Sequence, residues 1–279
     1  METEVSEQRK SQAQAFDRDL LFNSIKSLAH GTVSDADFDR IVREPPLDMR
    51  KARREDAHKA LLEIQAQSRQ RRQDYCRAVL ERDFVSAEFT FDRVQKDGAN
   101  SAAFDAALGV CASLVANHGS AQKPPLLLVQ GLPGSGKTVL CSCAVNYVLM
   151  HSESLTVRLV NFGSLKKTQL HANDEEWESL RRKRDEWQDF QQVDLLIIDN
   201  FLQDNKGLSA YEQQYLTDLF NLRRQMRKAL ILTTALDLKL LRDAIGASCY
   251  ESLCSYYTVA EQLLGRSRNQ EILLHGKAI

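Results

Sequence analysis

The stretch from residue 131 to residue 138 has the residue types and spacing of a phosphate-binding loop. It reads Gly131-Leu132-Pro133-Gly134-Ser135-Gly136-Lys137-Thr138, which fits the pattern G-x-x-x-x-G-K-[ST] (Walker A) at every fixed position. Glycines let the backbone wrap closely around an oligophosphate, and the start of the following helix favours negative charge. We therefore expect Lys137 to reach the β and γ phosphates of ATP and the Thr138 hydroxyl to take one position on Mg²⁺. An ordinary glycine-rich turn is the alternative, and the full pattern argues against it.

A carboxylate that completes the metal site is predicted at Asp199 (Walker B), which ends the apolar run Leu195-Leu196-Ile197-Ile198. Ligands bind at the carboxyl ends of the strands in open parallel sheets. Many ATPases of this layout place an acid at the next position, where this chain has Asn200. An amide holds a water molecule but cannot accept its proton, which predicts slow turnover unless Asp204 or another group substitutes.

A third candidate catalytic residue, besides Asp199 and Asn200, is Thr234 at the end of the apolar run that starts at Ala229. Its hydroxyl is placed to sense the γ phosphate or the attacking water. The same position is also typical of an ordinary strand end, and the sequence leaves both interpretations open.

Strand-like and helix-like segments alternate around these residues. Apolar runs predict strands over 126–130, 156–161, 193–199, 229–234 and 258–264; helical patterns cover 101–117, 137–150, 174–190 and 210–227, with short helices up to 253. Ser209 and Glu212 form a capping box at one of these helix starts. This alternation predicts an α/β fold with a parallel sheet covered by helices on both faces.

The first 84 residues differ from the rest of the chain. Their single glycine is Gly31. Helical patterns at 16–28 and 49–82 are separated by Pro45-Pro46. From Arg50 to Arg82 there are ten Lys or Arg against five Asp or Glu, which suits an acidic partner, nucleic acid or simply a solvated helix face. We expect two parts, a helical partner-binding segment at 1–84 and an ATPase domain at 85–279.

Composition narrows the class of protein further. The chain has 279 residues, 43% of them hydrophobic, and a formal net charge of −1. It has no apolar run long enough to span a membrane and starts with the polar residues Met1 to Glu4, so we expect a cytoplasmic protein without a membrane partner. The six cysteines form no C-x-x-C pair and are expected to be reduced core residues.

The order of these motifs resembles the AAA+ bacterial helicase loaders of the DnaC and DnaI type. The resemblance covers about residues 85–270 and includes Phe89-Thr90-Phe91-Asp92-Arg93 ahead of a helix, the arginines Arg223-Arg224, and Gly265-Arg266-Ser267-Arg268. It implies a P-loop NTPase (AAA+/ASCE) fold that binds ATP and Mg²⁺. It also implies that residues 1–84 grip a replicative DnaB-type helicase, and that the ATPase part assembles into a ring or spiral on single-stranded DNA.

Carried over residue by residue, the resemblance makes Arg266 or Arg268 the sensor arginine that contacts the nucleotide. The family usually has an arginine near Ser252 that reaches into the neighbouring subunit's site. Its absence here, together with Asn200, predicts weak ATPase activity, because such an arginine contributes on the order of 10³-fold or more in rate. Arg223, Arg224, Arg242 or none of them takes this role in trans.

The leading hypothesis is thus a loader that delivers the helicase to single-stranded DNA during initiation or restart of replication, with ATP acting mainly as a switch. The Arg50–Arg82 segment and Lys166-Lys167 would supply phosphate contacts. The alternatives are an IstB-type transposition-helper ATPase, distinguished by its partner, and a catalytically idle ATP-binding scaffold, distinguished by its turnover.

Overall fold

The computed structural model describes residues 49–117, 123–170, 177–202 and 206–264 of the chain. Contacts divide the chain into two compact units, Met1–Arg69 and Gln70–Ile279. Helix α3 (Met49–Arg82) runs through the boundary between them. Among the described residues, no helix is long and apolar enough to cross a membrane. The helix expected over 16–28 lies outside the described residues.

The larger unit is built on a five-stranded parallel sheet with the order β2-β3-β4-β1-β5. Its strands are β1 (Pro125–Gly131), β2 (Val157–Asn161), β3 (Leu195–Asp199), β4 (Ala229–Thr234) and β5 (Tyr257–Leu263). The strand β4 lies between β1, which leads into the glycine-rich loop, and β3, which ends at Asp199. The predicted α/β fold with a parallel sheet is therefore confirmed.

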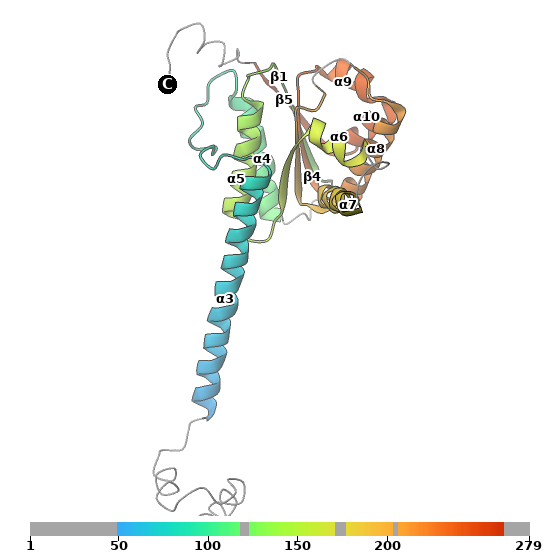
Figure 1. The fold of residues 1–279 in the computed structure, drawn as a ribbon. Coiled ribbons are helices and arrows are strands. Elements are labelled where there is room, and N and C mark those ends of the chain that lie inside the picture. The colour runs from blue at the N-terminus through green and yellow to red at the C-terminus, as the bar shows by residue number, and fades with distance from the viewer. Residues whose placement is uncertain (1–48, 118–122, 171–176, 203–205, 265–279) are drawn as a thin grey trace, which may run out of the picture. The chain divides into compact units, whose positions relative to one another are not determined.

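Helices cover both faces of this sheet, as Figure 1 shows. One face carries α4 (Ser101–Asn117) and α5 (Lys137–His151). The other carries α6 (Phe162–Leu170), α7 (Trp177–Gln192), α8 (Ala210–Gln225), α9 (Leu238–Ile245) and α10 (Ala247–Cys254). The predicted capping box is present at the start of α8, where the Ser209 hydroxyl accepts from the Glu212 N–H and the Glu212 carboxylate accepts from the Ser209 N–H. Helix α6 was not predicted.

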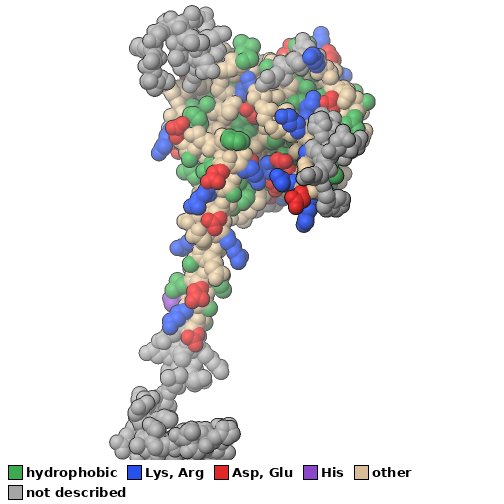
Figure 2. Space-filling model, viewed as in Figure 1, with side chains coloured by type: hydrophobic (Ala, Val, Ile, Leu, Met, Phe, Trp, Pro, Cys, Tyr) green, Lys and Arg blue, Asp and Glu red, His purple; other side chains and the backbone are tan. Residues whose placement is uncertain are grey.

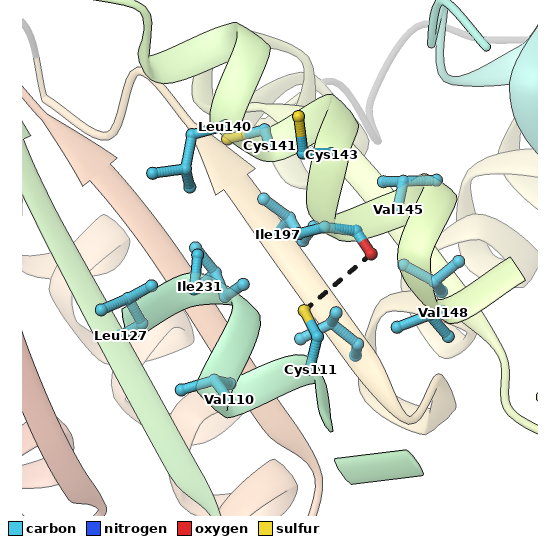
Figure 3. Close-up of a cluster of buried hydrophobic side chains, with 14 of the residues drawn as sticks. Val110, Cys111, Leu127, Leu140, Cys141, Cys143, Val145, Val148, Ile197 and Ile231 are labelled. Carbon is cyan, nitrogen blue, oxygen red and sulfur yellow. Dashed lines mark hydrogen bonds between the residues drawn. The ribbon is translucent and has the colours of Figure 1, made fainter. Parts of the chain in front are cut away.

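Two hydrophobic cores follow from the alternation of side chains along each strand. Leu127 and Ile197 point into the core under α4 and α5, whereas their neighbours Leu126 and Leu196 point into the core under α8 and α10. Figure 3 shows the first core, where Cys111 of α4 lies beside Val148 of α5 and its thiol donates to the Ala144 carbonyl. Because the strands are buried on both faces, they read as continuous apolar runs in the sequence.

The free edge of the sheet at β2 is closed, within the larger unit, by a side chain from the last turns of α3 and by one from the residue that follows the helix. The Tyr75 hydroxyl accepts from the Val157 N–H at 2.8 Å and donates to the Val157 carbonyl at 3.3 Å. The Asp83 carboxylate accepts from the Leu159 N–H at 2.8 Å. We call Tyr75 and Asp83 the edge clasp, because they occupy backbone groups that a further strand would otherwise bind.

Charges are mixed over the visible surface. Along α3, Lys and Arg alternate with Asp and Glu in the view of Figure 2, with hydrophobic side chains between them. Leu61, Leu62 and Ile64 of α3 are 51%, 51% and 63% exposed. Exposed apolar side chains that lie this close together on a helix are a candidate contact surface rather than part of a core.

Candidate nucleotide-binding site

The glycine-rich loop joins β1 to α5 at the carboxyl edge of the sheet. Gly134 and Gly136 adopt positive φ angles of 81° and 100°, a conformation that favours glycine. A Cβ atom on Gly131 would lie 2.5 Å from Ser135 Oγ and 3.0 Å from Leu263 Cβ. The start of the loop is thus packed closely against Ser135, its own fifth residue, and against β5. The loop leads into the start of α5, where an anion is favoured.

Lys137, the first residue of α5, lies inside this loop. Its ammonium donates to the carbonyl oxygens of Gly131 at 2.6 Å and Leu132 at 2.9 Å, and the residue is only 6% exposed. An ammonium has three donors, so a third remains for a ligand. Burial lowers the pKa of Lys137, and the nearby Asp199 carboxylate opposes this effect.

Thr138 and Asp199 meet although they are far apart in the sequence. The Thr138 hydroxyl donates to Asp199 Oδ2 at 2.8 Å, and Asp199 is 6% exposed at the end of β3. Cys141, one turn further along α5, lies with its thiol 3.9 Å from Asp199 Oδ1. Burial, with a smaller contribution from Asp199, raises the pKa of Cys141, so its thiol stays protonated.

The loop that follows Asp199 has an unusual backbone. Asn200 and Leu202 have positive φ angles of 56° and 51°. Asparagine tolerates this region, but leucine does so only when its surroundings hold it there. Asn200 lines the pocket described below and its amide donates to Asp199 Oδ2 at 3.3 Å.

Two successive threonines at the end of β4 hold this loop in different ways. The Thr233 hydroxyl donates to Asp199 Oδ1 and accepts from the Asn200 N–H. The Thr234 hydroxyl donates to the Leu202 carbonyl and accepts from the Leu236 N–H. Both threonines are fully buried. Thr234, the predicted candidate, thus bonds to backbone behind the pocket, and Thr233, which the sequence reasoning missed, contacts the carboxylate.

A pocket of about 460 Å³ opens beside the loop. Its floor is formed by residues 133–139, and its far wall is formed by Val94, Asn100 and Phe104 from the segment before α4 and from α4 itself. The Asn100 side chain bonds to the backbone of its own segment, accepting from the Asp97 N–H and donating to the Gln95 carbonyl. The lining therefore combines a loop that suits phosphate groups with the apolar side chains of Val94 and Phe104, and the volume is in the range of small-molecule sites.

The residues present fit a hard divalent cation next to an oligophosphate. Thr138 and Asp199 supply hydroxyl and carboxylate oxygens, the ligand types that Mg²⁺ prefers. Ser135 Oγ, which lies close to Gly131, is buried in the loop and has no hydrogen-bond partner among the described residues, a state that calls for an explanation such as a bound ligand.

The arginines considered for a role in trans differ in accessibility. Arg223 is fully buried and its guanidinium donates to the carbonyls of Phe190, Val193 and Ala229, so it cannot reach another subunit. Arg242, on α9, is exposed and stacks over the Tyr250 ring at 5.8 Å. Ser252 is 5% exposed and donates to the Ser248 carbonyl within α10. Asp204, Arg266 and Arg268 lie outside the described residues.

The strand order, the glycine-rich loop between β1 and α5, and Asp199 at the end of β3 together define the P-loop AAA+ fold. Comparison of structures agrees with this class. Domain III of the replication initiation protein DnaA from Thermotoga maritima is 18% identical, with a TM-score of 0.50 over 70% of this chain and 78% of that chain. AMPPCP-bound DnaA from Aquifex aeolicus is 19% identical, with a TM-score of 0.51 over 71% of this chain, which spans 58% of that protein. At these identities the likeness concerns the fold.

The chain was also compared with a further solved structure and with family models. A structure of DnaI is 14% identical, with a TM-score of 0.49 over 65% of this chain and 91% of that chain. A family model described as nephrocystin 3, N-terminal, matches residues 113–237, which include the loop, Asp199 and Thr234. The search of curated proteins found no match.

Proposed function

We propose that the protein is an ATP-binding AAA+ helicase loader, in which nucleotide acts mainly as a switch on assembly. The observation that carries the nucleotide part is that Lys137 and Thr138 of α5 line one pocket and that the Thr138 hydroxyl donates to Asp199 at the end of β3. Lys137 would bind the β and γ phosphates, and Thr138 and Asp199 would hold Mg²⁺. The metal would supply charge neutralisation between phosphate oxygens.

Turnover by this site is proposed to be slow. Asn200 lies at the pocket with an amide that orients water but takes no proton. In addition, Ser252 is buried where the loader family has an arginine that reaches the neighbouring site. We propose that Arg242, which is exposed, is the better candidate for a role in trans, and that Arg266 or Arg268 contacts the nucleotide from its own subunit.

We propose that α3 binds the partner protein, a replicative helicase. The exposed apolar residues Leu61, Leu62 and Ile64 of α3 lie in the N-terminal segment that would grip the replicative helicase. Basic residues of the same helix, with Lys166 and Lys167, would contact single-stranded DNA and make its binding sensitive to salt. The DnaA structures, one of them bound to AMPPCP and single-stranded DNA, support the proposal through their fold.

The test is co-purification of the full chain with a DnaB-type helicase, in the presence and absence of ATP. The variant Leu61→Ser/Leu62→Ser/Ile64→Ser is expected to lose the complex. A matched control, Met226→Ser/Leu240→Ser, removes exposed apolar residues elsewhere (42% and 39% exposed) and is expected to keep it. Binding of a transposase but not of the helicase would replace the loader proposal by the transposition-helper alternative.

A further inference from the structure

Thr233, near the end of β4, is hydrogen-bonded to Asp199 and to the loop that follows it. It is fully buried, and its hydroxyl oxygen accepts from the Asn200 N–H at 3.0 Å. The hydroxyl hydrogen therefore points at the remaining partner, Asp199 Oδ1, which as a carboxylate oxygen only accepts. The Thr233 carbonyl accepts from the Phe201 N–H at 2.6 Å. One residue of β4 thus binds three successive residues, the last residue of β3 and the two that follow it.

These bonds orient the Asp199 carboxylate. Thr233 occupies Oδ1, whereas Oδ2 accepts from the Thr138 hydroxyl at 2.8 Å and from the Asn200 amide at 3.3 Å. The same bonds hold Asn200 at a φ of 56°, a conformation that asparagine tolerates. Without the Thr233 hydroxyl, Asp199 Oδ1 would lose a hydrogen-bond donor that orients it, and the backbone N–H of Asn200 would lose its partner.

We propose that Thr233 is a positioning residue that orients Asp199 for the metal ion and fixes Asn200 at the pocket, and that Thr234 has no such role. This inference rests on the proposed function, in which magnesium and nucleotide bind at this site. Groups that hydrogen-bond to metal ligands typically account for about 10-fold to 100-fold in metal affinity. Thr234 bonds to the backbone of Leu202 and Leu236, so it supports the loop without contact to the carboxylate.

The experiment measures binding of a fluorescent ATP analogue as a function of Mg²⁺ concentration for the full chain and three variants. Thr233→Val keeps the branched shape and removes the hydroxyl; it is expected to raise the Mg²⁺ midpoint about 10-fold or more. Thr233→Ser keeps the hydroxyl and is expected to restore the wild-type midpoint. Thr234→Val, the matched control from the same strand end, is expected to keep the wild-type midpoint even if its melting temperature falls.

Different outcomes overturn different statements. If the wild-type chain binds the analogue and Thr233→Val keeps its Mg²⁺ midpoint, or if Thr234→Val shifts the midpoint as much, the role of Thr233 is wrong. If the wild-type chain binds no analogue at any Mg²⁺ concentration, the proposed function itself fails and the role fails with it.

A second measurement needs no variant and no ligand. The Asn200 amide hydrogen should exchange slowly with solvent in the nucleotide-free wild-type protein, because it is bonded to Thr233. Rapid exchange at Asn200 would overturn the proposal even if Thr233→Val did not fold.

Discussion

The change Tyr75→Phe tests whether the edge clasp contributes to the stability of the ATPase unit. It removes one hydroxyl and leaves the ring in place. That hydroxyl is bonded to both backbone groups of Val157, a residue that is fully buried on β2. After the change, neither group has its partner and no new strand is present to replace it.

The expected loss follows from these two orphaned groups. A buried polar group without a partner costs about 1–3 kcal/mol, so we expect a fall of about 2 kcal/mol in the free energy of unfolding. For a unit of the size of Gln70–Ile279, this corresponds to a fall of about 4–8 °C in Tm. Urea denaturation without nucleotide measures the free energy, and amide exchange at Val157 locates the effect.

The control for this prediction is Tyr257→Phe, because Tyr257 is 65% exposed on β5 and lies at the opposite edge of the sheet. It should change the free energy of unfolding by less than about 0.5 kcal/mol. Equal effects of the two changes, or unaltered exchange at Val157 in Tyr75→Phe, would refute the reasoning that side chains of α3 stand in for a strand.

Three other predictions concern the site and its surroundings. Lys137→Ala should weaken binding of a fluorescent ATP analogue by about 10-fold to 100-fold, since a charge-assisted hydrogen bond is lost; unchanged affinity would contradict the phosphate role. Asn200→Asp, which tolerates the same backbone angle, should raise phosphate release by about 10²-fold if the missing base limits turnover. Burial acts to raise the pKa of Asp194, but hydrogen bonds from Lys228 and Thr156 outweigh it and lower that pKa. Its stabilising effect should therefore be present at pH 7 and lost as the pH falls through the lowered pKa, so urea midpoints of Asp194→Asn and wild type should converge in acid.

Most strands of the sheet were predictable because each is a buried apolar run of the length that a strand requires. Helix α6 was not, since Phe162–Leu170 is short, contains Gly163 and two lysines, and lacks a clear helical period. Residues 258–264 were predicted as extended, and the structure pairs them with β1. The sequence contained no information on which edge of the sheet this strand joins.

The candidate site was predictable up to the point where strand register matters. Lys137, Thr138 and Asp199 belong to motifs whose spacing fixes their place. The choice between Thr233 and Thr234 depends on where β4 ends relative to β3, and the last paired residues are Ile198 and Leu232. In the edge clasp, Asp83 bonds a residue 76 positions further along the chain and Tyr75 bonds one 82 positions further along. No local sequence pattern reveals contacts of this kind.

Arg223 is a buried cation at the end of the sheet opposite the pocket. At the amino end of the strands, its charge is surrounded by the carbonyls of Phe190 in α7, of Val193 two residues before β3, and of Ala229, the first residue of β4. The planar guanidinium of Arg223 bonds several carbonyls at once, which the compact ammonium of a lysine cannot do. Even Arg223→Lys, which keeps the charge, should therefore destabilise this end of the sheet. An arginine therefore holds the end of the sheet that is remote from the pocket, whereas neutral threonine hydroxyls hold the loop after Asp199 at the other end.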